Sequence, residues 1–218
     1  MAKINILTFH FSNNLGAMLQ AYGLAQAVKA MGHDVQIIDY RPWTIRKACE
    51  RPLWRYRHPV RLIREVLFRH RIRNFRKTYL PLTRTYLDLE ELRRSPPQAD
   101  CIIVGSDQVW NISSPIRGFD PTFFLEFLGS GGPRRVSYAA SVGNGTELGE
   151  HRKQISDLLS RFDHISVRDV TSQKLVQLLV ERRVEHVLDP SFLIDYDAIT
   201  PPPIVKPPYI LAYCFRRN

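Results

Sequence analysis

The chain has 218 residues, and 44% of them are hydrophobic, which is enough to bury the core of one large domain. No run of about 18 apolar residues occurs, so the sequence predicts no membrane-spanning helix, and its start reads as a strand rather than as a signal peptide. The three cysteines (Cys49, Cys101 and Cys214) are too far apart for a metal site or a disulfide framework. We therefore expect a cytoplasmic protein without a bound metal or other cofactor.

The net charge of +10 comes from one segment. Between Arg41 and Lys77, thirteen Lys or Arg residues stand against two acids, Glu50 and Glu65, so the rest of the chain is close to neutral. Concentrated positive charge can attract nucleic acid or an anionic membrane. Because no nucleic-acid-binding motif accompanies the segment, we expect no nucleic-acid partner.

The first 40 residues predict a strand–helix–strand unit. Lys3–Phe9 and Val35–Tyr40 are short apolar runs, as expected for buried strands. Between them, Leu15–Met31 carries apolar residues at steps of three and four, which predicts a helix that Gly32 would end. This order implies parallel strands joined by a right-handed crossover.

The loop before this helix holds the first candidate binding residues. Asn13, Asn14 and Gly16 lie at the expected helix N-terminus, where free backbone N–H groups attract anions. The loop lacks the GxGxxG pattern of a dinucleotide site. The alternative interpretation is structural, with Ser12, Asn13 or Asn14 as an ordinary helix cap.

Residues 41–80 predict a basic helical insertion in the alternation of strands and helices. Pro52 and Pro59 interrupt its first half, and Val60–Tyr79 predicts an amphipathic helix whose polar faces carry arginines. Such a helix can lie on an anionic membrane surface. More commonly, the apolar side of such a helix packs on the domain and its charged side is solvated.

The central stretch follows a short helix that Asp88 would cap. Ile102–Val104 predicts a strand buried on both faces, and Gly105 ends it. Ligands of open α/β sheets bind beyond the carboxyl ends of the strands, so the polar and indole groups that follow are candidates for contacting a sugar or a phosphate. These groups belong to Ser106, Asp107, Trp110 and Asn111. Alternatively, Asp107 caps the next helix and Trp110 fills the core.

The second half of the chain continues the alternation. The expected strands are Arg135–Ala140, His164–Val167 and Glu185–Leu188, with helices at Glu150–Phe162 and Val170–Val180. Ser141 follows the first of these strands and Arg168 the second. A guanidinium can grip a carboxylate or phosphate with two parallel N–H bonds, although an ion pair with Asp169 or Asp189 is the plainer role for Arg168. Because parallel strands end at one edge of the sheet, we expect these polar residues to converge.

The sequence predicts three parts. Residues 1–195 form an α/β domain, and five prolines make residues 196–208 a semi-rigid linker. Residues 209–218 contain the apolar run Tyr209–Phe215, which reads as the first strand of a second, truncated domain.

Five stretches of the sequence, in order, resemble the polysaccharide pyruvyl transferase family. They are Asn13–Tyr22, Val104–Asn111, Ser137–Gly143, Ile165–Asp169 and Val187–Pro190. The run Gly-Ser-Asp-Gln-Val-Trp-Asn is a specific signal. The resemblance implies a Rossmann-like parallel sheet with helices on both faces, as the N-terminal half of a glycosyltransferase-B-like two-domain fold. It also implies transfer of a pyruvyl group from phosphoenolpyruvate to a saccharide, as a ketal that bridges two hydroxyls.

The resemblance also implies residue roles. Arg168 matches a family arginine that contacts the donor, whereas Ser106, Asp107, Trp110 and Asn111 suit the acceptor. Many members have a Gly-Asp pair where this chain has Gly16-Ala17. The catalytic histidine and further donor-binding cations of the family lie in its second domain. The chain is therefore expected to be the acceptor-side half of the enzyme, inactive or incomplete on its own.

Two alternatives remain open at this point. One is a nucleotide-sugar glycosyltransferase of the same architecture. The other is a non-catalytic module that binds an anionic polymer or a membrane through the basic segment.

Overall fold

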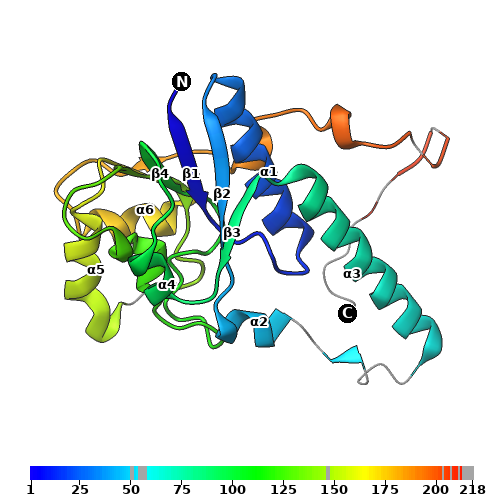
Figure 1. Ribbon diagram of the computed structural model, residues 1–218, viewed down its shortest axis with the longest axis horizontal. Coiled ribbons are helices and arrows are strands. Elements are labelled where there is room, and N and C mark those ends of the chain that lie inside the picture. The colour runs from blue at the N-terminus through cyan, green and yellow to red at the C-terminus, as the bar shows by residue number, and fades with distance from the viewer. Residues whose placement is uncertain are drawn as a thin grey trace.

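The computed structural model describes residues 1–49, 52–53, 58–145, 148–202, 204–206, 208–210 and 212. Within these ranges, seven parallel strands form one sheet in the order β3-β2-β1-β4-β5-β6-β7 (Figure 1). The strands are β1 (Lys3–Leu7), β2 (Asp34–Tyr40), β3 (Leu82–Tyr86), β4 (Cys101–Val104), β5 (Arg134–Ala140), β6 (His164–Val167) and β7 (Glu185–His186). The expected Rossmann-like α/β fold is confirmed.

Helices cover both faces of the sheet. They are α1 (Leu15–Ala30), α2 (Trp43–Cys49), α3 (Pro59–Tyr79), α4 (Leu89–Arg94), α5 (Arg152–Leu159) and α6 (Val170–Gln177), with short 3-10 helices η2 (Pro121–Phe124), η3 (Glu126–Leu128), η4 (Gly149–His151), η5 (Pro190–Phe192) and η6 (Asp197–Ile199). Successive residues of a strand face opposite sides, so Ile6 of β1 packs in one core cluster with α1, whereas Leu7 packs in another with α4, α5 and α6.

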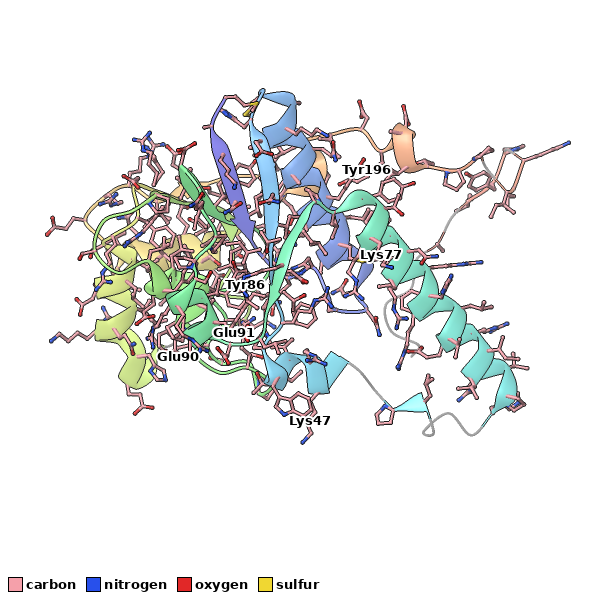
Figure 2. The ribbon with its side chains drawn as sticks, in the orientation of Figure 1. Lys47, Lys77, Tyr86, Glu90, Glu91 and Tyr196 are labelled. Carbon is pink, nitrogen blue, oxygen red and sulfur yellow. The ribbon has the colours of Figure 1, made fainter. Side chains whose placement is uncertain are left out.

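The helix α1 is capped at its start, is followed by a glycine at its end, and packs against a distant segment of the chain at its middle. Asn14 caps its start, and Gly32, with φ of +85°, follows its end as the sequence predicts. A Cβ atom on Gly23 would lie 2.5 Å from the backbone oxygen of Pro190. The Tyr196 hydroxyl, labelled in Figure 2, donates to the backbone oxygen of Leu19 at 3.3 Å nearby. Segments 167 to 177 residues apart in sequence are thus packed closely, which fixes the position of the turn that follows β7.

The basic segment connects β2 to its parallel neighbour β3, so it serves as a crossover connection rather than as an interruption of the fold. The predicted helix at Val60–Tyr79 agrees with α3, which begins one residue earlier. The strand β3 is absent from the sequence prediction because its residues, Leu-Thr-Arg-Thr-Tyr, are mostly polar and lie at the edge of the sheet. Polar edge strands give no apolar run for a pattern search to find.

The predicted strand at Tyr209–Phe215 falls largely outside the described residues, because residues 211 and 213–218 are among those not described. Within the described ranges, no helix has the length and apolar character needed to cross a membrane.

Candidate functional site

The strand order reverses between β1 and β4, which makes this the switch point of the sheet. Loops that follow two such strands separate and leave a crevice, the usual place of a ligand in an open α/β sheet. A cavity of about 220 Å³ lies there, and we call it the switch-point cavity. Its lining residues are Phe9, Phe11, Ser12, Asn14, Ile45, Asp107, Ser114, Ile116 and Arg117. A larger hollow of about 630 Å³ lies at the opposite edge, where β5 and β6 begin, away from the strand ends that carry the polar residues.

Asp107 combines an unusual backbone with a perturbed carboxyl group. Its φ is +80°, a left-handed conformation that aspartate tolerates better than most residues. Burial raises the pKa of the Asp107 carboxyl, although the charges of Arg168 and Arg117 oppose this shift. The N–H of Gln108 donates to its Oδ1 at 2.8 Å and also favours the charged form. A carboxyl group with a raised pKa beside a cavity can exchange a proton with a ligand.

Arg117 is a cation of this cavity that the sequence analysis does not identify. Its guanidinium lies over the ring of Phe9, 4.6 Å from the centroid. It also donates to the backbone oxygens of Gln108 at 2.6 Å and Asn111 at 2.9 Å. Burial lowers the pKa of Arg117, and the charges of Asp120 and Asp107 partly offset this shift. The residue lies in an irregular segment without periodicity, so only its nearness to the central stretch could have indicated it.

The loop that contains Asn13, Asn14 and Gly16, which we call the asparagine loop, caps a helix and also lines the cavity. Asn14 accepts from the N–H groups of Gly16 at 2.9 Å and Ala17 at 3.4 Å, so the cap interpretation is confirmed for this residue. Its side chain also lines the switch-point cavity, whereas Asn13 lines a second pocket on the α3 side. The N–H of Gly16 is engaged by the cap.

Arg168 is held in a small network at the carboxyl ends of β4, β6 and β7. Its Nη1 contacts Oδ2 of Asp189 at 3.0 Å and Oγ of Ser106 at 3.3 Å. Ser106, which is fully buried, donates to the same Asp189 oxygen at 2.6 Å. Burial alone would raise the pKa of Asp189, but these hydrogen bonds and those from Ser191 lower it. The geometry thus includes the ion pair considered for Arg168, whose side chain keeps 29% exposure at the edge.

Ser141 is likewise engaged within the protein. Its Oγ donates to Oδ2 of Asp169 at 2.7 Å and accepts from the N–H of Gly143 at 3.0 Å. Asp169 caps α6 by accepting from the N–H of Ser172 at 2.7 Å. Burial opposes ionisation of Asp169, but these bonds prevail and lower its pKa. Ser141 therefore shapes the loop after β5.

Trp110 and Asn111 lie behind the cavity rather than in its lining. Trp110 is 2% exposed, its indole N–H donates to the backbone oxygen of Phe123 at 2.9 Å, and its ring stacks on Phe124. In this position it packs in the core and presents no face to a sugar ring. Asn111 donates through Nδ2 to Gln108 at 3.1 Å, and its buried Oδ1 has no partner within the described residues.

A second network, which the sequence analysis misses, lies at the ends of β1 and β2. Asp39 is 3% exposed and accepts from His10 Nε2 at 2.7 Å, Arg41 Nε at 2.6 Å and Thr85 Oγ1 at 2.6 Å. Burial opposes its charge, but these donors lower the pKa of Asp39 to about 2. Asp39 lies inside an apolar strand pattern and His10 in a turn, so sequence alone does not indicate that they meet.

The described part of the chain contains no group of three or more His, Cys, Asp or Glu side chains placed to hold a metal ion. The candidate site is instead a set of carboxyl, amide and guanidinium groups, suited to hydrogen-bonding a polar or anionic ligand.

Comparisons with known proteins agree with the resemblance in the sequence. The family model for polysaccharide pyruvyl transferase matches residues 14–215, a range that includes Asn14, Asp107 and Arg168. Neither the curated proteins nor the solved structures contain a match. On the strength of the family match, the chain belongs to the polysaccharide pyruvyl transferase family.

Proposed function

We propose that the protein transfers a pyruvyl group from phosphoenolpyruvate to a saccharide, and that the described domain is the acceptor-side half of a glycosyltransferase-B-like enzyme. The observation that carries this proposal is Asp107, a carboxyl with a raised pKa that lines the switch-point cavity and lies within the range that the family model matches. The family match supplies the reaction class, and the cavity supplies a place for the sugar.

The reaction defines what the site has to do. Two sugar hydroxyls form C–O bonds to the enol carbon of phosphoenolpyruvate, and the C–O bond to phosphate breaks. Of the two protons that the hydroxyls lose, one ends on the methylene carbon, which becomes a methyl group, and the other leaves with phosphate. Asp107 would accept a proton from an attacking hydroxyl, a role for which a carboxyl with a raised pKa is suited.

The remaining candidates divide by position. Asn14 and Arg117 would contact the acceptor because they line the cavity with Asp107. Arg168 would meet the donor carboxylate or phosphate at the strand edge, in exchange for part of its contact with Asp189. Ser106, Ser141, Trp110 and Asn111 would support these groups from behind. As the resemblance implies, a second domain would supply the catalytic histidine and further cations.

The test is a pyruvylation assay on the full-length gene product and on residues 1–218. Phosphate release from phosphoenolpyruvate and the methyl signal of the ketal in an NMR spectrum are followed together. We expect turnover by the full-length protein and an Asp107→Asn variant slowed by about 10²–10⁴-fold. The exposed Asp157→Asn substitution on α5 is the matched control. Binding of a nucleotide sugar without binding of phosphoenolpyruvate, measured by calorimetry, would instead support a glycosyltransferase.

We propose, second, that the protein makes a peripheral contact with an anionic membrane. The exposed residues of α3 support this proposal. Its first half keeps the apolar residues Val60, Ile63, Val66 and Leu67 exposed at 44–58%, so this part of the helix does not pack on the domain. Arginines flank these residues, as in helices that lie in a membrane interface. Cosedimentation with anionic vesicles, lost in Ile63→Glu but retained with Asp157→Asn, would support this contact. Equal sedimentation with neutral vesicles would argue against it.

A further inference from the structure

A second pocket, of about 250 Å³, lies beside the switch-point cavity and is lined mainly by arginines. We call it the arginine pocket. Its lining residues are Phe11, Asn13, Arg41, Arg46, Arg69, Arg73 and Arg76. Figure 2 shows the arrangement of the elements that bound it: α2, which carries the labelled Lys47, lies opposite α3. Three separate segments of the chain therefore bring guanidinium groups to one place.

The position of these arginines follows from the helix geometry. Arg69, Arg73 and Arg76 lie four and three residues apart, so they share one face of α3. Nη1 of Arg76 donates to the backbone oxygen of Phe11 at 2.6 Å, which ties α3 to the loop after β1. Arg41 extends from the end of β2, where its Nε contacts Asp39. The convergence is thus built by packing of the fold.

Among the described residues, the arginines that line the pocket outnumber the carboxylates that pair with them. Asp39 pairs with Arg41 at 2.6 Å and Glu65 pairs with Arg69 at 2.7 Å. The guanidinium of Arg46 lies over the ring of Trp43 at 5.9 Å. Within the described residues, neither the Arg46 side chain nor the Arg73 side chain makes a hydrogen bond or an ion pair. Like charges repel, so an arrangement of this kind favours a bound anion. Guanidinium groups match the oxygens of phosphate in geometry and in charge.

The size and position of the pocket suggest what the anion belongs to. Whole small-molecule sites span roughly 300–1,000 Å³, so a pocket of about 250 Å³ suits part of a ligand. Phe11 lines both this pocket and the switch-point cavity, so one ligand can extend from one to the other. Arg168, the proposed donor contact, follows β6 on the far side of β4, whereas the arginine pocket lies beside β1 and β2. The donor and this anion would therefore approach from opposite sides.

We propose that the arginine pocket binds a phosphate or diphosphate group of the acceptor, so that the acceptor is a phosphorylated saccharide. The assignment of this group to the acceptor rests on the proposed function, whereas anion binding by the pocket does not. Asp107 then faces the sugar in the switch-point cavity while the arginines hold its phosphate end.

Calorimetry tests the pocket directly, with inorganic pyrophosphate as the probe and the full-length protein in low salt. The test variants are Arg73→Gln and Arg46→Gln, and the matched control is Arg71→Gln, an exposed residue of α3 outside the pocket lining. We expect pyrophosphate to bind, about tenfold or more weakly in each test variant, and with unchanged affinity in the control. Absence of binding, or equal weakening in the control, would overturn the site.

Three further arms separate the sources of the phosphate. If the test variants lose phosphoenolpyruvate binding, the pocket serves the donor and the assignment to the acceptor fails. If they lose binding to anionic vesicles but keep pyrophosphate affinity, the pocket holds lipid headgroups and the assignment again fails. In pyruvylation assays, we expect Arg73→Gln to lower kcat/KM for a phosphorylated sugar about tenfold but to leave that for the dephosphorylated sugar unchanged. Equal effects on both sugars would refute the proposal, whereas absent turnover with intact pyrophosphate binding would refute only pyruvyl transfer.

Discussion

Replacement of Asp107 separates a functional carboxyl from a structural one. Asparagine keeps the Oδ1 atom that accepts from the Gln108 N–H and tolerates the φ of +80°, so it removes the charge and little else. Because burial raises the pKa of Asp107, the fold favours its neutral form. The resulting stability is fully present below the unfolded pKa of about 4 and is lost as the pH rises through the folded pKa.

The magnitudes follow from these contacts. At pH 4 we expect Asp107→Asn to change the free energy of unfolding by less than about 0.5 kcal/mol. At pH 7 the variant should be more stable than the unaltered protein. Asp107→Ala should lose about 2 kcal/mol, since it removes one hydrogen bond worth about 1 kcal/mol and places a less tolerant residue in a left-handed conformation that costs about 1 kcal/mol. That loss corresponds to a fall of about 4–8 °C in Tm.

Urea unfolding at pH 4 and pH 7, with the pyruvylation assay in parallel, measures both sides of this prediction. A stabilised but slow Asp107→Asn variant is the expected result. If the variant is instead destabilised at pH 7 as much as Asp107→Ala, the carboxylate charge supports the fold and the reasoning fails.

Three other predictions concern the frame of the site. Gly23→Ala should destabilise the protein by up to about 2 kcal/mol in urea unfolding, because crowding of the Pro190 carbonyl costs about 1–3 kcal/mol and the helix-propensity gain returns only about 1 kcal/mol. A stabilised variant would show that η5 moves aside without cost. Asp39, with a pKa lowered to about 2, should contribute about 2 kcal/mol to the free energy of unfolding above pH 4, and this contribution is lost as the pH falls toward 2. Acid unfolding of the Asp39→Asn variant should lack this loss. An acid-unfolding curve identical to that of the unaltered protein would contradict the prediction. Trp110→Ala should cost about 3–5 kcal/mol, and Trp110→Phe less, whereas a small cost for the alanine variant would show that the indole is not a core residue.

The sequence predicts the sheet better than it predicts the contacts at its edge. β6 agrees with the expected range to the residue, and β1, β2 and β5 agree apart from their ends, because each has an apolar run between turn residues. The segment expected as one helix at Glu150–Phe162 is divided into η4 and the shorter α5. Periodicity finds an apolar face but fixes the ends of an element only loosely.

Parallel strand ends bring polar residues to a shared edge, and this much follows from topology. What topology leaves open is which groups face a ligand and which pair with each other. Ser106 and Trp110 stand four residues apart beside Asp107, and both are buried. The partner of Ser106, Asp189, lies 83 residues away in the chain, and such long-range pairing has no local signal. Arg73 and Arg46 likewise line one pocket only because α3 packs against the loop after β1.

The partly buried bonds among Ser106, Arg168 and Asp189 connect the ends of β4, β6 and β7, and the backbone bond from Ser141 to Asp107 adds the end of β5. The side of the candidate site that these strand ends form is therefore rigid. The other side of the candidate site is formed by the asparagine loop, α2 and α3. The first half of α3 extends past the sheet with little packing (Figure 1). Any adjustment of the domain to an arriving molecule should therefore come from that side, where amide hydrogen exchange would slow on binding while the tips of β4, β5 and β6 stay unchanged.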